Sequence, residues 1–336
     1  MSVTQIEAFS CGKTHASPQD NEDAFVLVPD RLYAVIDGAT DRSGTRYNGM
    51  LAGRYASYLV KQTIEDTFLS HKGSLPAFPA LLHAINLKIQ AAYDAHGILD
   101  KARENATYRF TAALALVEQK GDDLDIYTIG DCGVRINATQ TIRTTKDLDH
   151  ITALLRQAGW HFLQNKPMGD EERELASRRL CMQGLRMSGA VDHALFDEKV
   201  VEGIFAEAYA QACADLPHVP VSLIRHLLEQ GIIHGQHVYQ NCEKTCLGYA
   251  AIDGFDIPSG LIGHQRLPLA GITSIELFSD GYFDPPADFG IAAWEQSHRR
   301  VEEKDPAKIL IWLGPKGTTK NQWTDDRTYL GIKRMV

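Results

Sequence analysis

Two apolar segments that lie far apart in the chain each run directly into an Asp-Gly pair. They are Tyr33-Ala-Val-Ile-Asp-Gly38 and Ile275-Glu-Leu-Phe-Ser-Asp-Gly281. Asp-Gly is a common turn dipeptide, so a single pair would indicate only a solvated turn. An apolar strand that ends on a carboxylate is different, because burial beside a charge is costly unless the charge is compensated. The feature predicts a sheet that collects these strand ends around a cation.

Further acidic residues occur where strands are expected to end or loops to begin. The acidic clusters are Glu22-Asp23, Asp37-Gly38, Asp280-Gly281 and Asp325-Asp326. Hard cations such as Mg²⁺ and Mn²⁺ prefer oxygen ligands and are commonly held by a few carboxylates from separate segments. Glycine after the aspartate is expected to let the backbone turn sharply and to bring its carbonyl within reach of the ion.

Hydrophobic periodicity predicts grouped strands and grouped helices in the first half of the chain. Strands are expected at 24–29, 32–37, 108–117, 124–129 and 133–136, and helices at 47–69 and 78–96. In the second half, helices are expected at 169–179, 196–216 and 292–303, and strands at 274–278, 308–313 and 328–333. Such grouping favours an α+β fold of antiparallel sheets covered by helices over a regular alternating parallel fold.

The composition is that of a globular protein with an acidic surface. Of the 336 residues, 44% are hydrophobic and 23% charged, and the formal net charge is -9. This charge disfavours nucleic acid and anionic membranes as partners, whereas bound cations would let an acidic protein handle phosphate. The N-terminus lacks the features of a signal peptide, and the six cysteines are mostly scattered, so we expect free thiols and a cytoplasmic location.

Five short segments together resemble one known family. They are Asn21-Glu-Asp-Ala24, Val35-Ile-Asp-Gly38, Ile129-Gly-Asp-Cys132, Ser279-Asp-Gly281 and Asp325-Asp-Arg-Thr328. Their order and rough spacing are similar to those of the PPM (type-2C) metal-dependent serine/threonine phosphatases, in a divergent, bacterial-like form. The resemblance covers about residues 20–158 and 272–335 and leaves the middle of the chain outside it.

The resemblance implies a four-layer αββα sandwich of two antiparallel β-sheets flanked by helices. It implies a single phosphatase domain over 1–336 with a long flap-like insertion at about 160–272, and two Mg²⁺ or Mn²⁺ ions, with a third in some members. The implied activity is hydrolysis of phosphoserine and phosphothreonine on proteins by a metal-activated water. A phosphorylated protein would then be the partner, and no protein nucleophile would be needed.

The resemblance also assigns roles to individual residues. It implies that Asp37 bridges the two ions, that the Gly38 carbonyl binds one of them, and that Asp280 and Asp325 complete the other. Glu22 and Asp23 would act mainly through metal-bound waters, and Asp131 would hold the third ion together with Asp280. Cys132 replaces a serine common in the family motif, and we expect it to be a small core residue.

The sequence departs from the family at positions that bind the substrate phosphate or donate a proton. Pro18 stands where members usually carry an arginine that binds the substrate phosphate, and Ala39 replaces a histidine that donates a proton in some members. Lys13, His15 or Arg42 could substitute for the arginine, since each lies on a loop next to a motif. Two alternatives to a protein phosphatase therefore stay open. One is a regulatory binding protein with a vestigial metal centre, and the other is a phosphatase of a small phosphorylated metabolite.

The middle region contains four residues with donor atoms that suit zinc. His234, His237, Cys242 and Cys246 follow one another at spacings that match no standard zinc motif. The chain has thirteen histidines, which makes chance clustering easy. The run therefore predicts either a structural zinc site or ordinary loop residues.

Overall fold

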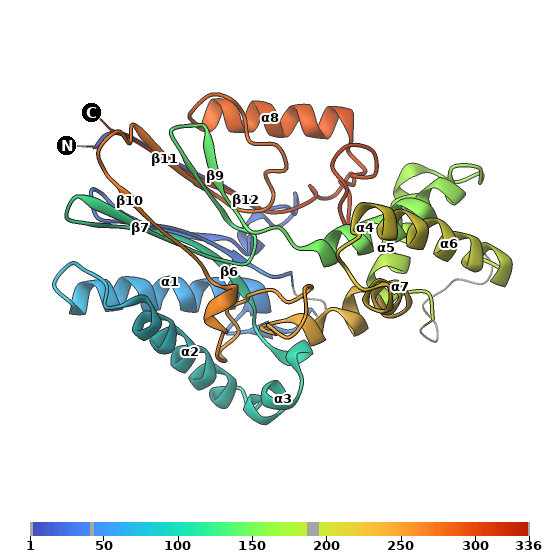
Figure 1. Ribbon diagram of the computed structural model, residues 1–336, viewed down its shortest axis with the longest axis horizontal. Helices are drawn as coiled ribbons and strands as arrows, with labels where there is room; N and C mark the ends of the chain where they lie inside the picture. The colour runs from blue at the N-terminus through green and yellow to red at the C-terminus, as the bar shows by residue number, and fades with distance from the viewer. Residues whose placement is uncertain (1–2, 41–43, 187–194, 335–336) are drawn as a thin grey trace.

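Two five-stranded antiparallel sheets form the centre of the computed structural model, which describes residues 3–40, 44–186 and 195–334 (Figure 1). The first sheet has the order β1 (Val3–Cys11), β12 (Arg327–Arg334), β11 (Ser274–Phe278), β8 (Gly133–Ile136) and β9 (Gln140–Ile142). The second has the order β10 (Gly263–Pro268), β7 (Asp123–Ile129), β6 (Ala112–Lys120), β3 (Leu32–Gly38) and β2 (Ala24–Val28).

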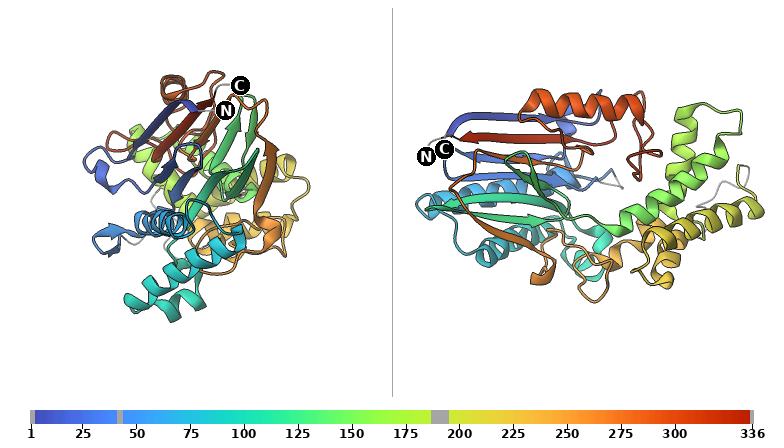
Figure 2. Two further views of the ribbon diagram at one scale, coloured as in Figure 1. Left: turned by 90° about the vertical axis from the view of Figure 1, so that its left-hand side faces the viewer. Right: turned by 45° about the horizontal axis from the view of Figure 1, so that its top comes forward.

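The sheets are stacked face to face and helices cover their outer faces (Figure 2). Strand β3 shows why, since alternate side chains of a strand point to opposite faces. Ala34 and Ile36 pack under α1 (Ala52–Ser70) and α2 (Phe78–Ala95), whereas Tyr33 packs between the sheets. Helix α8 (Ile291–Lys304) covers the other sheet. The predicted four-layer αββα sandwich is confirmed.

A buried carboxylate joins α8 to the first sheet. Glu276 on β11 is fully buried and accepts hydrogen bonds from the Trp294 indole and the Tyr329 hydroxyl, both at 2.8 Å. Its other oxygen pairs with Arg135 on β8 at 2.6 Å. Because every lone pair of a buried charge must be compensated, these donors fix the layer order at this side of the sandwich.

Four helices form a separate cluster, the helical lobe, at the end of the sandwich away from the two termini (Figure 1). The lobe consists of α4 (Asp147–Leu163), α5 (Asp170–Gln183), α6 (Glu198–Asp215) and α7 (Val221–Gly235). It has its own apolar core, which includes Leu154, Leu180, Ile204 and Leu228. The lobe begins before the expected insertion boundary at 160, and β10 returns to the sheet before the expected end at 272.

Three expected elements differ in the structure. The strand expected at 308–313 is wrong, because the Asp305 carboxylate accepts the backbone N–H groups of the four residues 309–312 and winds them into a loop. The helix expected from 47 begins at Ala52, after a small hairpin of β4 (Arg46–Tyr47) and β5 (Met50–Leu51). The strand expected from 108 begins at Ala112, because Asn105 caps a short 3₁₀ turn before it.

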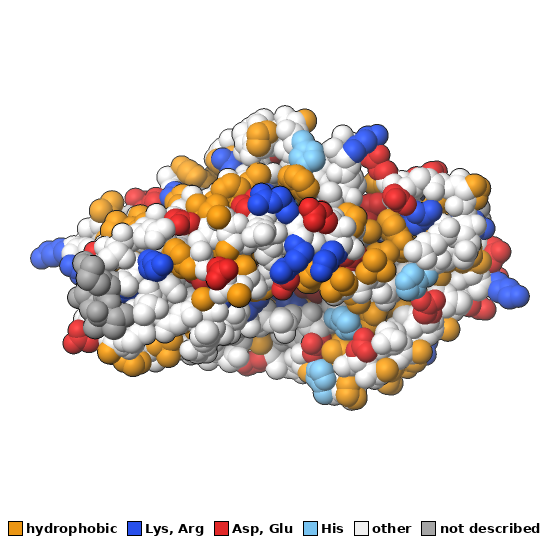
Figure 3. Space-filling model, turned by 90° about the horizontal axis from the view of Figure 1, so that it is seen from above, with side chains coloured by type: hydrophobic (Ala, Val, Ile, Leu, Met, Phe, Trp, Pro, Cys, Tyr) orange, Lys and Arg blue, Asp and Glu red, His pale blue; other side chains and the backbone are white. Residues whose placement is uncertain are grey.

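Other elements had no clear signal in the sequence. They are β1, β9, β10, α3 (Leu99–Glu104), α4, α7 and the 3₁₀ turns η1 (Pro18–Asp20), η2 (Ala106–Tyr108), η3 (His237–Tyr239) and η4 (Ser259–Leu261). Within the described ranges, no helix is both long and apolar enough to cross a bilayer. On the face nearest α8, acidic and basic side chains are intermingled (Figure 3).

Candidate metal centre

The strand order brings the five family-like segments, each of which contains an acidic residue, to one end of the sandwich. β3 ends beside the start of β2 and β11 ends beside the start of β12, because each pair is antiparallel. β7 runs parallel to β3 across the intervening β6, so the Gly130-Asp131 corner lies at the same end. Segments from the two ends of the chain therefore share one edge, which faces the helical lobe (Figure 1).

Three carboxylates are close enough to share an ion. One oxygen each from Asp37, Asp131 and Asp280 lies within 4.8 Å of the others, and all three residues are partly buried. Burial raises the pKa of Asp37 well above its usual range, and the neighbouring Asp280 charge raises it further. Burial, followed by Asp325 and Asp131, raises the pKa of Asp280 to about 7. A cation at this position would relieve both the burial cost and the mutual repulsion.

Asp23 leaves one buried oxygen available at the same end. Its Oδ2 accepts the Ser279 hydroxyl at 2.7 Å, and Ser279 Oγ in turn accepts the Thr328 N–H at 2.9 Å. Its Oδ1 is buried without a hydrogen-bond partner among the described residues. Burial and the nearby Asp326 raise the pKa of Asp23 well above its usual range. An unpaired buried carboxylate oxygen is costly, which fits a site built for a cation or its bound water.

Close packing requires glycine in both Asp-Gly pairs, and only the second pair also lies in a turn. Neither glycine has a positive φ, and Gly38 is the last residue of β3. A Cβ on Gly38 would lie 2.1 Å from the Gly53 carbonyl oxygen, and one on Gly281 would lie 2.0 Å from the Asp326 carbonyl oxygen. Asp280-Gly281 forms the expected turn, in which the Tyr282 N–H donates to the Ser279 carbonyl at 3.4 Å. The turn expected at Asp37-Gly38 is wrong, because Gly38 is still part of β3. Both glycines also let neighbouring backbone, the first turn of α1 and the start of β12, approach the carboxylates.

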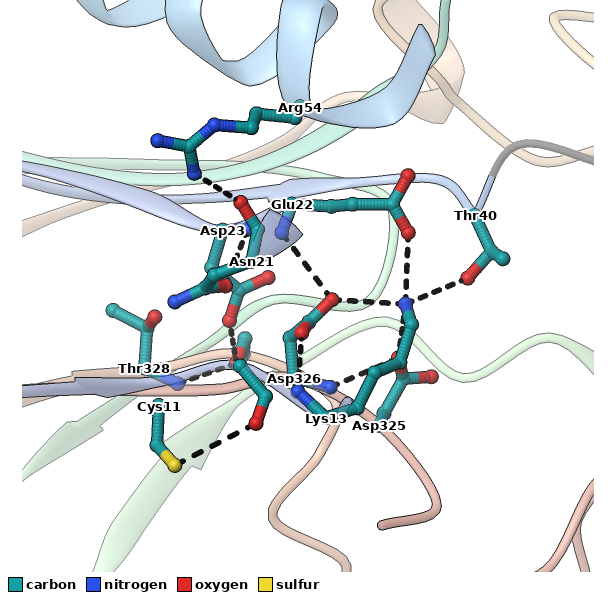
Figure 4. Close-up of polar contacts among 12 residues, drawn as sticks. Cys11, Lys13, Asn21, Glu22, Asp23, Thr40, Arg54, Asp325, Asp326 and Thr328 are labelled. Carbon is teal, nitrogen blue, oxygen red and sulfur yellow. Dashed lines mark hydrogen bonds and ion pairs between the residues drawn. The ribbon is translucent and has the colours of Figure 1, made fainter. Parts of the chain in front are cut away.

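Lys13 lies among the acids (Figure 4). Its Nζ contacts Glu22 at 2.8 Å, Asp326 at 2.8 Å and Asp325 at 3.2 Å, and it donates to the Thr40 hydroxyl at 2.9 Å. Its backbone N–H also donates to Asp326 Oδ1 at 2.7 Å. Burial alone would lower the pKa of Lys13, but the carboxylates, Asp325 first, raise it. Lys13 therefore carries a positive charge inside the cluster.

Two further lysines pair with the acids. Lys316 lies 2.6 Å from Asp325, and Lys146 lies 2.6 Å from Asp131. Burial raises the pKa of both carboxyls. Lys316 nevertheless lowers the pKa of Asp325, and Lys146 lowers the pKa of Asp131, below the usual range. Seven carboxylates lie near three ammonium groups and the Arg143 guanidinium, whose charge also lowers the pKa of Asp131, so a net negative charge is left for divalent cations to offset. The seven acids are Glu22, Asp23, Asp37, Asp131, Asp280, Asp325 and Asp326.

The other expected phosphate-binding residues are placed differently. His15 Nδ1 lies 3.2 Å from the Lys320 carbonyl oxygen, and its ring contacts Trp323 edge-on. Arg42 lies outside the described residues. Cys132 is fully buried between the two sheets, and burial raises the pKa of its thiol, so the expected core role is confirmed.

The four potential zinc ligands do not form a cluster comparable to the aspartates. Among the described residues, the aspartate trio is the one group in which three such donor atoms come within 4.8 Å of each other. His234 lies in the last turn of α7, Cys246 is exposed, and His237 lines a pocket beside the aspartates.

That pocket has a volume of about 340 Å³ and joins the acids to the helical lobe. Its floor includes Asp37, Asp131, Asp280 and Asp325. Its wall comes from α7 with the segment after it and from the neighbouring segment between α3 and β6. The wall residues include Ile232, Ile233, Gln236, His237, Gln240 and Tyr249 from the first and Thr107, Arg109 and Thr111 from the second.

Several residues of this site had no role assigned from sequence. Ser279 and Asp326 belong to recognised motifs, and their positions beside a motif aspartate were the available signal. Lys146 lies within the part of the chain that the family resemblance covers, but its partner Asp131 could not be foreseen from spacing. Lys316 had no sequence signal, since its place depends on the conformation of a loop.

Comparison with known proteins gives distant structural matches. No protein-family model and no curated protein matches the chain. The Mycobacterium tuberculosis serine/threonine phosphatase PstP/Ppp matches at 17% identity and a TM-score of 0.41, covering 99% of each chain. Stp1 from Staphylococcus aureus matches at 13% identity and a TM-score of 0.44, covering 100% of this chain and 98% of that one.

The catalytic domain of PstP in complex with two manganese ions also matches, at 17% identity and a TM-score of 0.42 over 99% of each chain. These matched structures are serine/threonine phosphatases. Identities and TM-scores this low leave the argument about function to the geometry of the site.

Proposed function

We propose that the chain is a metal-dependent phosphatase of the PPM family that hydrolyses phosphoserine and phosphothreonine on proteins. The observation that carries the proposal is the convergence of carboxylates from five separate segments at one end of the sandwich. Three of their oxygens lie within 4.8 Å of one another, beside the unpaired Oδ1 of Asp23. Clustered carboxylates repel each other, so this arrangement is favourable only with cations present.

Asp37, Asp280 and Asp325 would hold two Mg²⁺ or Mn²⁺ ions together with the Gly38 carbonyl. Glu22 and Asp23 would act through water, and Asp131 would serve a third ion. When bound, such ions lower the pKa of water and neutralise charge on a phosphoryl group. Hydrolysis breaks the P–O ester bond with one water and releases the free hydroxyl and inorganic phosphate.

Lys13 and Lys316 would supply the positive charge that the missing arginine at Pro18 supplies in relatives. Both ammonium groups lie against Asp325, at 3.2 and 2.6 Å. A lysine binds phosphate as a point charge and lacks the bidentate fork of an arginine. The chain would therefore orient a substrate phosphate less strictly than an arginine-bearing relative.

The pocket favours a second candidate, a phosphatase of a small phosphorylated metabolite. A volume of about 340 Å³, walled on one side by the helical lobe, is at the lower end of the range for small-ligand sites. A panel of phosphopeptides against sugar and nucleotide phosphates separates the two candidates, because a small-molecule enzyme would turn over the latter far faster.

The test is release of nitrophenol from p-nitrophenyl phosphate in Mn²⁺, comparing the parent chain with Asp37→Ala and Asp280→Ala. Both variants should lose activity and stay folded. Asp100→Ala, an exposed carboxylate on α3, is the matched control and should keep it. Failure of the parent to hydrolyse any phosphoester while metal is bound would overturn the enzyme proposal. It would favour a regulatory binding protein with a vestigial centre.

A further inference from the structure

A buried ion pair joins the helical lobe to the loop that precedes Asp325. Arg156 on α4 is 0% exposed and Glu174 on α5 is 2% exposed, and the two side chains pair directly. Desolvation largely offsets the attraction within a buried pair, so apolar residues of similar size would stabilise the lobe as well. The pair is therefore better explained by the geometry that it fixes than by net stability.

The pair holds four backbone groups of the loop between α8 and β12. Arg156 donates to three carbonyl oxygens at 2.6–3.2 Å, and Glu174 Oε1 accepts one N–H at 2.8 Å. The four groups are the carbonyls of Ala307, Lys308 and Gly314 and the N–H of Gly317. Both ends of the loop are thus tied to one guanidinium-carboxylate pair.

The base of this loop is also tightly closed. A Cβ on Gly317 would lie 2.7 Å from the Ala307 carbonyl oxygen, so the backbones at the two ends of the loop are in direct contact. The Thr318 N–H donates to the Pro306 carbonyl at 2.8 Å just beyond this contact. Lys316 lies between two tied residues, Gly314 and Gly317, and its backbone position is set by them.

Lys316 reaches from this loop into the metal centre. Its Nζ lies 2.6 Å from Asp325 Oδ2, and the two side chains are only 15% and 17% exposed. Lys13 occupies the other oxygen of Asp325 at 3.2 Å. An ammonium group at this distance competes with a cation for the carboxylate, and it also presents positive charge to an incoming phosphate.

We infer that the Arg156–Glu174 pair is a positioning device that sets where Lys316 lies against Asp325. The helical lobe is then a working part of the metal centre and not a detachable insertion. The inference rests on the proposed function, in which Asp325 holds a cation and Lys316 attracts phosphate. Release of Lys316 should have two opposite effects: tighter cation binding at Asp325 and weaker binding of the phosphate substrate.

The first test is Arg156→Met, with Mn²⁺ affinity measured by calorimetry on chelator-treated protein and KM measured with p-nitrophenyl phosphate. We expect Mn²⁺ affinity to rise and KM to rise, each by about tenfold, the scale of one charge-assisted contact. General disruption of the fold would weaken both. Arg225→Met, which removes an exposed ion pair on α7 of the same lobe, should change neither.

The second test is the double variant with Lys316→Met. If Arg156 acts through Lys316, the double variant should match Lys316→Met alone in Mn²⁺ affinity, because the shared effect is already lost. Additive effects, or a folded Arg156→Met with unchanged Mn²⁺ affinity, would overturn the inference. Should Arg156→Met fail to fold, Glu174→Gln carries the same test with an expected change of about threefold.

The Mn²⁺ measurement separates this inference from the proposed function. A parent chain that binds Mn²⁺ but hydrolyses no phosphoester would contradict the enzyme proposal, while the affinity change in Arg156→Met would still support the positioning role. A parent chain that binds no Mn²⁺ would overturn both.

Discussion

The carboxylate end of the sandwich and the helical lobe are built in opposite ways. The carboxylate end gathers short segments from both ends of the chain, with Asp37 next to the last residue of β3 and Asp280 two residues after β11. The lobe is one continuous stretch of four helices around its own apolar core. The first region concentrates repelling charge that costs stability, and the second buries apolar area that supplies it.

The two regions meet at the pocket and at the loop before Asp325. The lobe supplies part of the pocket wall through Ile232 and Ile233, and it holds the loop through Arg156. The comparison teaches that the acids lie at or near strand ends, whereas the helical lobe places two of the lysines that pair with them, Lys316 through the loop bonded to Arg156 and Lys146 at the start of α4. Substitutions in the two regions should therefore have different, and in places opposite, effects.

The largest expected effect is that of Asp37→Asn. Loss of the central carboxylate should lower kcat/KM by about 10³-fold or more, the scale of losing a key electrostatic group. In chelator, the same variant should melt at a higher temperature than the parent, since Asn removes a buried charge whose raised pKa reports repulsion. Steady-state kinetics and thermal melts measure the two effects. A variant that is both inactive and less stable without metal would break the comparison.

A smaller effect is expected from Leu228→Ala in the lobe. This side chain is fully buried, so its truncation should lower the free energy of unfolding by about 3 kcal/mol. Urea denaturation followed by circular dichroism measures the loss. One cooperative transition would agree with a lobe that is integral to the domain, whereas a separate early transition for the lobe would show that it folds independently.

Much of the carboxylate end could be predicted because its signals are local. The apolar runs of β3 and β11 locate the strand ends, and Asp37 and Asp280 lie within two residues of those ends. The residues 308–313 were wrongly expected to be a strand, since the apolar run does not reveal that Asp305 takes four of the backbone N–H groups.

The lysine partners of the acids could not be predicted either, because their positions also depend on contacts that form only in the folded chain. Lys316 reaches Asp325 only because the tied loop places it there, and Lys146 meets Asp131 only because α4 begins beside the end of β7. Each depends on contacts between residues distant in sequence. No local pattern of residue types records such contacts.

The smallest expected effects on stability come from replacing one glycine by alanine in each of the two regions. Gly281→Ala would place a Cβ 2.0 Å from the Asp326 carbonyl oxygen, and we expect a loss of about 2 kcal/mol. Gly203→Ala on α6 meets open space and should stabilise the chain by about 0.5–1 kcal/mol, since alanine favours a helix. Denaturant titration of both variants compares them. Equal effects of the same sign would contradict the close packing at the carboxylate end.

The most direct test of the account is Mn²⁺ binding to the chelator-treated chain. The account predicts that calorimetry will find two ions per chain and that Asp37→Ala and Asp280→Ala will each lose binding while staying folded. It also predicts that Mn²⁺ will raise the melting temperature of the parent chain and not that of the variants. A parent chain that binds no Mn²⁺, or variants that bind it as well as the parent, would contradict the claim that these aspartates hold cations.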